Sequence, residues 1–234
     1  MERVAPNIEI RLFRRDQVPG QGIAVVIDVY LATSNLILLT QKGASSLLVV
    51  NEESLDLAKA RYPKSLIVGE SLLPIKFDIS NSSSEIEGAQ IEGKDVLYMT
   101  INGTKALESV DYQGCEKVLV ASFLNLSATA EYLRKYFPEK EISLFAAGDQ
   151  GKYVLEDKLC AQILADRFLK RPFVWSKLRV KAKRFIEKWY GGWEKDIEFA
   201  LALDSSPMVL QSLVFDNLLK VVKIPRGFGD GSIQ

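Results

Sequence analysis

The sequence predicts an α/β fold of three layers, in which a mostly parallel sheet is flanked by helices. Short β-branched runs alternate with amphipathic stretches, which is the pattern of strands followed by covering helices. Several runs are apolar throughout, as expected for strands buried on both faces of a parallel sheet. Hydrophobic residues make up 47% and charged residues 26% of the 234 positions, a composition that excludes disordered and fibrous classes and can fill one globular core.

The first strand–helix cycle begins with the predicted strand Ile23–Asp28. Thr33 and Ser34 then offer the hydroxyl side chains that favour a helix start, Asn35–Lys42 has leucines at helical spacing, and Gly43 ends the helix. The segments that follow are expected to be a strand at Leu47–Val50, a helix at Ser54–Ala60 and a strand at Leu66–Val68.

A second cycle begins with the predicted strand Val96–Tyr98 and turns at Asn102-Gly103-Thr104 into a short helix that runs to Val110. The segments after it are expected to be a strand at Lys117–Ala121, a helix at Asn125–Lys135, a strand at Ile142–Phe145 and a helix at Leu155–Leu169. Further on we expect helices at Asp196–Leu203 and Met208–Leu219, a strand at Val221–Ile224 and a frayed tail at Gly227–Gln234.

The two cycles resemble each other at a constant separation of 71 residues, which aligns Val25 with Val96 and Thr33 with Thr104. Any two strand–helix–strand units share much of this pattern, so the match is either a duplication or a coincidence of architecture. We expect a single α/β domain over residues 1–234. A duplication would give it two related lobes, about 1–90 and 91–234, with the site between them.

Charge and residue content exclude several classes of chemistry. Lysine plus arginine and aspartate plus glutamate both total 30, so nothing chain-wide favours nucleic acid or an anionic membrane as partner. Histidine is absent, which excludes Ser-His-Asp and Cys-His catalysis and imidazole zinc sites. Cys115 and Cys160 lack a CxxC spacing, so buried apolar roles are favoured over nucleophilic ones.

No stretch of the sequence has the length and apolar character of a membrane span, and the first residues lack the apolar run of a signal peptide. The two cysteines also suit a reducing compartment. We therefore expect a cytoplasmic protein without a membrane segment.

Two segments each allow two interpretations. Ser176–Tyr190 is predicted to be an amphipathic helix with a basic outer face, which is either simply solvated or a surface for an anion, RNA or a partner. Asp78–Gly93 is polar and then acidic, and it is either a surface loop or linker or a loop that carries part of a site.

Polar side chains follow the predicted strands at the points where each strand ends. They are Asp28, Glu70, Asn102, Ser122 and Asp149. Ligands of open α/β sheets bind at this edge, and helix N-termini near Thr33, Thr104 and Asn125 would suit a phosphate there. The carboxylates that suit Mg²⁺ are Asp28, Glu70, Asp78, Glu156 and Asp157.

Each of these residues also has a structural interpretation, and no Walker or dinucleotide glycine motif decides between the two. Thr33 and Thr104 could cap helices, whereas Asp28 and Asp78 could form turns. Glu156 and its neighbour could be acids that interact with a helix dipole. The shared position at strand ends is what favours a site.

Several blocks of sequence occur in the order of a known family, over about residues 20–170. They are Val26–Ser34 with Gly43-Ala44, Gly69-Glu70, Phe77–Ser82, Thr100–Leu107, Ser122–Asn125, Ala147-Gly148 and Leu155–Asp157. Together they resemble the 2-phosphosulfolactate phosphatases. The resemblance implies an α/β, Mg²⁺-dependent acid phosphatase that removes phosphate from phosphosulfolactate on the way to coenzyme M.

The resemblance implies a set of site residues, to which we assign roles by their chemistry. The expected catalytic residues are Asp28, Thr33 and Asn102. The expected phosphate-binding residues are Ser34, Asn81, Ser82, Gly103, Thr104 and Asn125. The expected metal ligands are Asp28, Glu70, Asp78, Glu156 and Asp157.

The chain departs from the family pattern at Leu31, where arginine is usual, at Lys76, where glycine is usual, and at Ser83, where proline is usual. Leucine cannot form the bidentate pairs that a guanidinium makes with phosphate or sulfonate. The expected function is Mg²⁺-dependent hydrolysis of a small acidic phosphate monoester. The alternatives are a non-catalytic anion-binding protein of the same fold and RNA or partner binding through Ser176–Lys188, and a homodimer is compatible with each.

Overall fold

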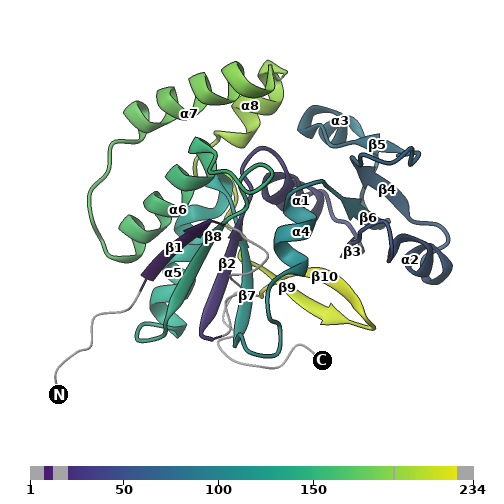
Figure 1. Ribbon diagram of the computed structural model, residues 1–234, viewed down its shortest axis with the longest axis horizontal. Helices are drawn as coiled ribbons and strands as arrows, with labels where there is room; N and C mark the ends of the chain where they lie inside the picture. Colours follow the sequence, from purple (N-terminus) through teal and green to yellow (C-terminus); the bar gives the residue numbers. More distant parts are fainter. Residues whose placement is uncertain (1–7, 13–20, 192, 226–234) are drawn as a thin grey trace.

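The computed structural model describes residues 8–12, 21–191 and 193–225. Over these residues ten strands form one mixed, mostly parallel sheet in the order β1-β8-β2-β7-β9-β10-β3-β6-β4-β5 (Figure 1). The strands are β1 (Ile8–Leu12), β2 (Ile23–Ile27), β3 (Ser46–Val49), β4 (Leu66–Gly69), β5 (Ile79–Ser80), β6 (Asp95–Met99), β7 (Lys117–Ala121), β8 (Ile142–Ala146), β9 (Leu210–Phe215) and β10 (Leu218–Lys223). The three-layer α/β fold expected from the sequence is confirmed.

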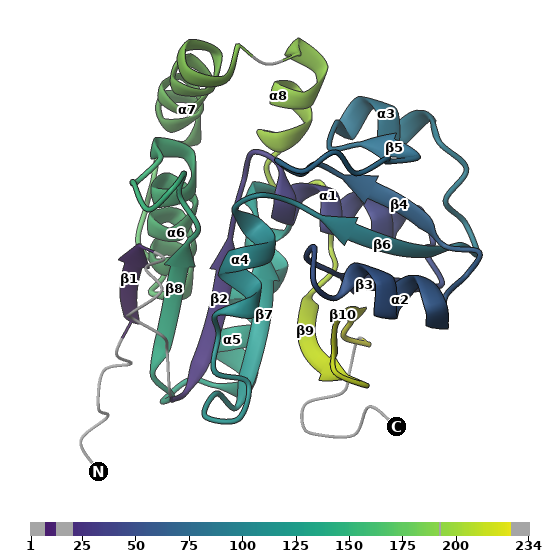
Figure 2. The ribbon, with the colours of Figure 1, turned by 45° about the vertical axis from the view of Figure 1, so that its right-hand side comes forward.

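The sheet consists of two parallel halves joined by an antiparallel hairpin. One half is β1-β8-β2-β7 and the other is β3-β6-β4-β5. The β9–β10 hairpin pairs antiparallel with β7 on one side and with β3 on the other. Figure 2 shows the hairpin between the two halves. The mixed sheet is therefore continuous from β1 to β5.

Helices cover both faces of the sheet. They are α1 (Ala32–Gln41), α2 (Leu55–Arg61), α3 (Ser83–Gly88), α4 (Gly103–Glu108), α5 (Leu126–Tyr136), α6 (Leu155–Phe168), α7 (Trp175–Tyr190) and α8 (Glu194–Ala200). Apolar residues of α1, α3 and α4 form a cluster with one face of both sheet halves. The opposite face is covered by α5 and α6 over one half and by α2 over the other.

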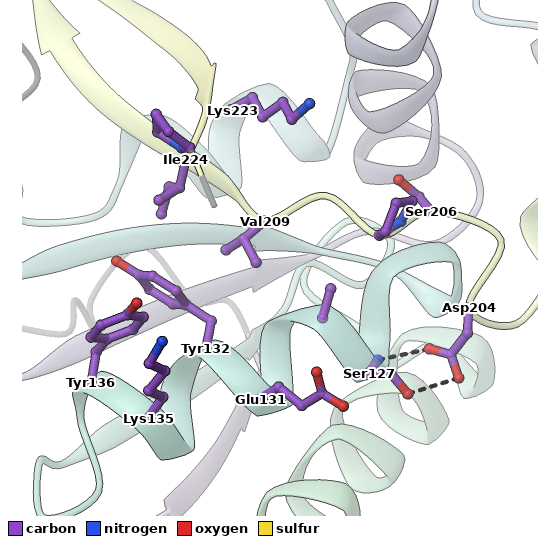
Figure 3. A pocket seen from close by; sticks show the side chains of 13 residues that line it. Ser127, Glu131, Tyr132, Lys135, Tyr136, Asp204, Ser206, Val209, Lys223 and Ile224 are labelled. Atoms are coloured by element: carbon purple, nitrogen blue, oxygen red, sulfur yellow. Dashed lines mark hydrogen bonds between the residues drawn. The ribbon is translucent and has the colours of Figure 1, made fainter. Parts of the chain in front are cut away.

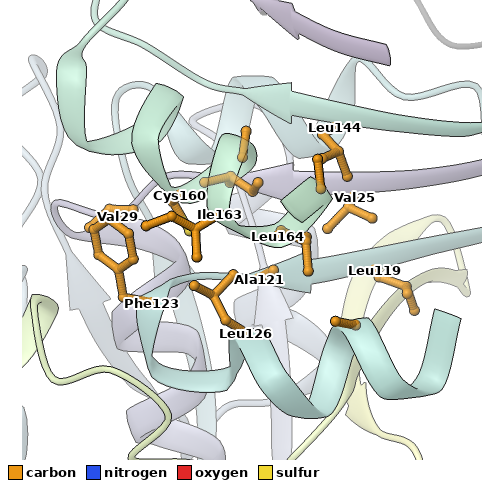
Figure 4. Close-up of a cluster of buried hydrophobic side chains, with 14 of the residues drawn as sticks. Val25, Val29, Leu119, Ala121, Phe123, Leu126, Leu144, Cys160, Ile163 and Leu164 are labelled. Atoms are coloured by element: carbon orange, nitrogen blue, oxygen red, sulfur yellow. The ribbon is translucent and has the colours of Figure 1, made fainter. Parts of the chain in front are cut away.

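The cluster beneath α5 and α6 shows why the strands are apolar on both faces. Val25, Leu119 and Leu144 come from three neighbouring strands and pack against Ile163 and other side chains of the helices (Figure 4). The alternate residues of β2 and β7 belong to the cluster on the other face. Full burial of one such side chain contributes about 1.5–3 kcal/mol, so these strands hold the site edge in place.

The two similar strand–helix cycles occupy equivalent places in the sheet. Counted inwards from either edge, β2 and β6 are the third strands, and β7 and β3 are the fourth. In each cycle a threonine hydroxyl near the helix start accepts a hydrogen bond from the backbone just after the strand: Asp28 N–H to Thr33 at 3.1 Å and Thr100 N–H to Thr104 at 2.9 Å.

The expected boundary between two lobes, near residue 90, does not coincide with the division between the two halves of the sheet. The sheet half β3-β6-β4-β5 takes strands from both sides of residue 90, with β6 between β3 and β4. A split of the chain at that point would therefore separate hydrogen-bonded neighbours. The division into two lobes stays a prediction.

Three segments differ from the sequence expectations. Met208–Leu219 was expected to be helical, but it forms β9 and the start of β10, because its residues pair with strands on both sides. Asp78–Gly93 contains β5 and α3 rather than loop alone. Ile8–Leu12 forms an edge strand beside β8 that the periodicity did not reveal. The expected tail at residues 227–234 lies outside the described residues.

Both cysteines are buried in the apolar clusters, in agreement with the apolar role expected for them. Among the described residues, no helix is both long enough and apolar enough to cross a membrane.

Candidate active site

A cavity of about 240 Å³ lies where the ends of strands from both sheet halves meet. The segments that follow β2, β4, β6 and β8 all contribute to it, and α6 and α7 add side chains from their ends. The residues around it are Asp28, Tyr30, Leu31, Glu70, Asn81, Ile101, Asn102, Gly148, Asp149, Val154, Glu156, Asp157 and Tyr190.

The two sheet halves meet at this cavity because the starts of α1 and α4 lie in contact. A Cβ atom placed on Gly103, the first residue of α4, would lie 2.2 Å from the Cβ of Ala32 and 2.9 Å from Asp28 Oδ2. Only glycine leaves room for this approach. Gly103 was expected to bind phosphate, and its observed part is to let the loop of α4 reach Asp28.

Asp28 is buried directly after β2, and its Oδ1 accepts a hydrogen bond from the Ala32 N–H at 3.3 Å. Burial, followed by the charge of Asp157, raises the pKa of Asp28 well above its usual range. A second carboxylate therefore makes ionisation of Asp28 costly, unless positive charge enters the cavity.

Asp157 connects the loop after β2 with the loop after β8. Its two carboxylate oxygens accept hydrogen bonds from the Val29 N–H at 2.7 Å and the Gly148 N–H at 2.9 Å. Burial, together with the charge of Glu156, raises the pKa of Asp157 to about 8 in spite of these bonds. Asp157 thus fixes the shape of the cavity as well as its charge.

The carboxyl group of Glu156 takes a hydrogen bond from Tyr190 but keeps one oxygen for another partner. Burial raises its pKa to about 7, and the charges of Asp28 and Asp149 act in the same direction. Its Oε2 is buried and has no hydrogen-bond partner among the described residues. A buried acceptor without a partner is costly, so this oxygen is available for a proton, a metal ion or a ligand.

Two asparagines position the remaining carboxylates. Asn102 donates from its amide to Asp149 Oδ1 at 3.1 Å. The side-chain oxygen of Asn81 accepts from the Tyr98 hydroxyl at 2.6 Å, which turns its amide group toward Glu70. Burial raises the pKa of Glu70, and the hydrogen bond from Asn81 opposes that shift.

As far as the structure describes the chain, the lining of the cavity contains five carboxyl groups and neither lysine nor arginine. Among the described residues no group of three or more acidic or cysteine side chains is spaced as a ready-made metal cage. Mg²⁺ does not require one, because it commonly binds through one or two carboxylates and completes its shell with water and phosphate oxygens. The donors present, including the unpartnered Glu156 Oε2, fit such an ion.

Several expected phosphate ligands lie beside the cavity but serve the backbone. Thr33 donates to the Asp28 carbonyl at 2.7 Å, and Ser34 donates to the Val29 carbonyl at 2.8 Å. Thr104 accepts from the Thr100 N–H. They fix the loops from which Asp28 and Asn102 project. The caps of the two helices are Leu31 and Asn102, so neither threonine is a helix cap.

Three other expected site residues lie elsewhere. Asn125 is buried beneath β9 and donates to the carbonyls of Val120 and Met208, both at 3.2 Å. Asp78 is exposed and accepts from the Ile67 N–H. Ser82 is the N-cap of α3. The structure therefore gives these side chains structural contacts away from the cavity lining.

The set assigned from the sequence leaves out three cavity residues with polar groups: Tyr30, Asp149 and Tyr190. Asp149 had a detectable signal, because it follows a strand as Asp28 does. The two tyrosines had none, since only packing brings the end of α7 to the loop after β2, where the two rings lie 5.4 Å apart.

A larger cavity of about 550 Å³ lies between α5 and the segment that leads into β9 (Figure 3). Its lining includes Ser127, Tyr132, Asp204 and Lys223. None of the expected site residues lines it, so size alone does not identify the site.

Comparison with known proteins identifies the family of the chain. Residues 11–217 match the family described as 2-phosphosulpholactate phosphatase. The chain belongs to this family. A relative from Thermotoga petrophila, named a probable 2-phosphosulfolactate phosphatase, is 36% identical over 203 residues, which cover 77% of this chain and 85% of the relative.

Two further relatives carry the same name. The protein from Thermotoga maritima is 40% identical over 152 residues, or 63% of each chain. The protein from Caldanaerobacter subterraneus is 30% identical over 210 residues, which cover 79% of this chain and 85% of the relative. Membership in this family supports a phosphoric monoester hydrolase.

Proposed function

We propose that this protein is a Mg²⁺-dependent phosphatase that hydrolyses a small acidic phosphate monoester, with 2-phosphosulfolactate, the compound in its relatives' names, as the first candidate. The observation that carries the proposal is the small cavity with five carboxyl groups, at the strand ends of a chain of this family. A cavity of about 240 Å³ is below the ~300–1,000 Å³ typical of sites for drug-sized ligands, which favours a small substrate.

Positive charge is required before a phosphate can enter this cavity. Asp28 and Glu70 are the side chains best placed to hold Mg²⁺, and Glu156 keeps its proton for the leaving group. The bound ion would neutralise phosphate oxygens and lower the pKa of neighbouring carboxyl groups. Asp28 would then be ionised at neutral pH, although burial and its acidic neighbours oppose this in the metal-free protein.

The reaction requires a nucleophile in line with the ester oxygen. Asp28, or a water held by it, forms the new bond to phosphorus while the bond from phosphorus to the ester oxygen breaks. Where Asp28 itself attacks, water then cleaves the acyl phosphate, which releases phosphate and restores the carboxylate. The leaving alkoxide takes a proton from a carboxyl group that is protonated near neutral pH, for which Glu156 is suited. The amide of Asn102 is placed to donate to a phosphate oxygen.

Leu31 makes part of the lining apolar. Since a leucine offers no hydrogen-bond donor, the acidic group of the substrate is not held by a guanidinium at this position. We therefore expect a weaker preference for a sulfonate over a carboxylate than a bidentate arginine would give.

The test is phosphate release from a panel of small phosphoesters, including phosphosulfolactate, esters of two- to four-carbon hydroxy acids, sugar phosphates and 4-nitrophenyl phosphate. We expect turnover with Mg²⁺, loss of turnover with EDTA, and at least a thousandfold decrease in Asp28→Asn. Asp56→Asn is the matched control, because Asp56 is an exposed acid on α2, and it should retain activity. Folded protein that releases no phosphate from any ester would contradict the proposal.

A second candidate, a non-catalytic protein that binds a small anion, is favoured by the apolar Leu31 alone. Calorimetry with phosphate and a small sulfonate separates the two functions, because a sensor would bind tightly without turnover. The acidic lining counts against this candidate, since an anion would meet five carboxyl groups and no lysine or arginine.

A further inference from the structure

The hairpin of helices α7 and α8 crosses the edge of the sheet at which the cavity lies. α7 packs against α6, the helix that carries Glu156, whereas α8 packs against α3 in the other half of the molecule. Figure 1 and Figure 2 both show this pair of helices above the strand ends, with α8 between α7 and α3. The hairpin therefore bridges the two sides of the cavity.

The far end of the bridge is fastened by one buried carboxylate. Asp196 of α8 accepts hydrogen bonds from the N–H of Ser84 at 2.8 Å, the hydroxyl of Ser84 at 2.5 Å and the hydroxyl of Ser82 at 3.2 Å. These groups belong to the start of α3, next to Asn81 in the cavity lining. A charged acceptor with three donors is among the stronger contacts of its kind.

Ion pairs hold the two helices of the bridge together. Glu198 of α8 pairs with Arg179 and with Lys183 of α7, the latter at 2.7 Å. Part of the positive charge of α7 is therefore used within the hairpin. Surface ion pairs contribute little singly, but this pair of contacts fixes how α8 lies against α7.

The middle of the bridge reaches the cavity through Tyr190, the last residue of α7. Its ring lies 5.4 Å from the ring of Tyr30 at an interplanar angle of 33°. Burial, with the charges of Asp196 and Glu156, raises the pKa of Tyr30 to about 12. Tyr30 therefore lies within reach of the charges of both Asp196 at the fastening point and Glu156 in the cavity.

The lining of the cavity contains both polar and apolar side chains. The carboxylates and asparagines would face a phosphate and its counter-ion. The apolar surfaces come from the two tyrosines, with Leu31, Ile101 and Val154. The organic part of a phosphate ester would lie against this apolar wall, and Tyr190 is its one member supplied by the hairpin.

We infer that α7 and α8 form a specificity cap, in which Tyr190 contacts the organic part of the substrate and Asp196 holds the cap in place. The inference rests on the proposed function and deepens it, since a fixed aromatic wall over a small cavity selects short, compact phosphate esters. Tyr190 is a specificity-determining residue, and Asp196 is a positioning residue that acts through the cap.

The first experiment measures selectivity with two substrates, the phosphate ester of a three-carbon hydroxy acid and 4-nitrophenyl phosphate. Tyr190→Ala removes the wall, so kcat/KM for the small ester divided by that for the aryl ester should fall at least tenfold, mainly through KM of the small ester. Tyr190→Phe keeps the ring but loses the hydroxyl that hydrogen-bonds Glu156, so kcat for both esters can change while the ratio of the two kcat/KM values should stay within threefold of the wild type.

Tyr136→Ala is the matched control, because Tyr136 is also the last residue of a helix and lies away from this cavity. It should leave the ratio unchanged. An unchanged ratio in Tyr190→Ala would overturn the inference while the phosphatase proposal still stood.

The second experiment tests the fastening point. Asp196→Ala removes the acceptor for both serines and should shift the selectivity ratio in the same direction as Tyr190→Ala, at least threefold. Asp196→Asn keeps one acceptor oxygen and should restore most of the wild-type ratio. A merely structural role would lower the melting temperature of Asp196→Ala without changing the ratio, and that result would contradict a positioning role.

A binding measurement separates failure of the cap from failure of the proposed reaction. Thermal shifts with phosphonoacetate and with phenylphosphonate, in the presence of Mg²⁺, report the same size preference without turnover. In one outcome the wild type hydrolyses no ester, and the preference for the smaller anion is at least fivefold weaker in Tyr190→Ala than in the wild type. That result would contradict the proposed reaction and support the specificity cap. If the wild type binds neither anion and hydrolyses nothing, both fail.

Discussion

The carboxyl groups of Asp28, Glu156 and Asp157 are buried together, and each has a raised pKa. Because they are buried together, their ionisation above neutral pH destabilises the folded, metal-free protein. The same residues are identifiable in the sequence as acids at a strand end and in the first turn of a helix. Their raised pKa values cannot be identified from the sequence, because they depend on how far each carboxyl group lies from water and from the other two.

The first prediction concerns stability in EDTA. Because the folded pKa of Glu156 is raised from 4.5 to about 7, its protonated form favours the folded state, and this contribution is lost as pH rises from about 4.5 through 7. Urea unfolding should therefore give a lower free energy at pH 8 than at pH 5. In Glu156→Gln that difference should shrink by about 1–3 kcal/mol.

The exposed Glu139 offers a control, since Glu139→Gln should have the same pH dependence as the wild type. Equal pH dependence in Glu156→Gln and the wild type would show that Glu156 titrates alike in the folded and unfolded states. Added Mg²⁺ should reduce the loss of stability at pH 8, because a cation stabilises the ionised carboxylates.

At the level of elements, the close approach of α1 and α4 is what brings the two sheet halves to one cavity. Gly103 permits it, and the Cβ of Ala32 is the atom that any side chain at this position would meet. The Asn102-Gly103-Thr104 sequence predicted a turn into a helix correctly. It did not reveal that another helix start lies against the glycine, since that contact joins residues far apart in the chain.

The second prediction follows from this contact. Gly103→Ala should lower the free energy of unfolding by about 2–3 kcal/mol and reduce turnover, because the added methyl group overlaps Ala32 and pushes against Asp28. Gly88→Ala is the control, since a Cβ on Gly88 meets nothing within 4 Å. Urea titrations and phosphate release measure both effects, and Ala32→Gly in the same chain should recover part of the loss.

The β9–β10 hairpin is the element for which the sequence interpretation was wrong. A helix was expected at Met208–Leu219, whereas Asp216 and Asn217 in this segment both adopt a positive φ, of 51° and 62°. Two such residues between apolar runs are typical of a two-residue hairpin turn. The signal was present, but the position of the hairpin between β7 and β3 depends on pairing with strands far away in the chain.

On the scale of the whole molecule, the continuous sheet makes the site dependent on both halves. Asp28, Asp149 and Glu156 come from one half, whereas Glu70, Asn81 and Asn102 come from the other. Unfolding experiments therefore test whether the protein consists of the two expected lobes. Cooperative unfolding is expected where one sheet and one apolar cluster extend through both halves.

The third prediction is a single unfolding transition. Circular dichroism and tryptophan fluorescence should give coincident urea curves for the wild type, and Mg²⁺ with phosphate should move both curves together. Two separated transitions would instead indicate lobes that fold independently. The cytoplasmic location, the absence of nucleic-acid binding and a homodimer all stay predictions, for which gel filtration and salt-dependent RNA binding are direct measurements.

The sequence by itself determined the α/β class, most of the strands and helices, the family, and the acids at the strand ends, because each depends on local periodicity or on short blocks. Tertiary structure alone decided which of those acids share a cavity, that Asn125 and Asp78 lie outside it, and that Tyr190 lies within it. The reason is physical: a side chain's burial, charge and hydrogen-bond partners are set by segments that only folding brings together.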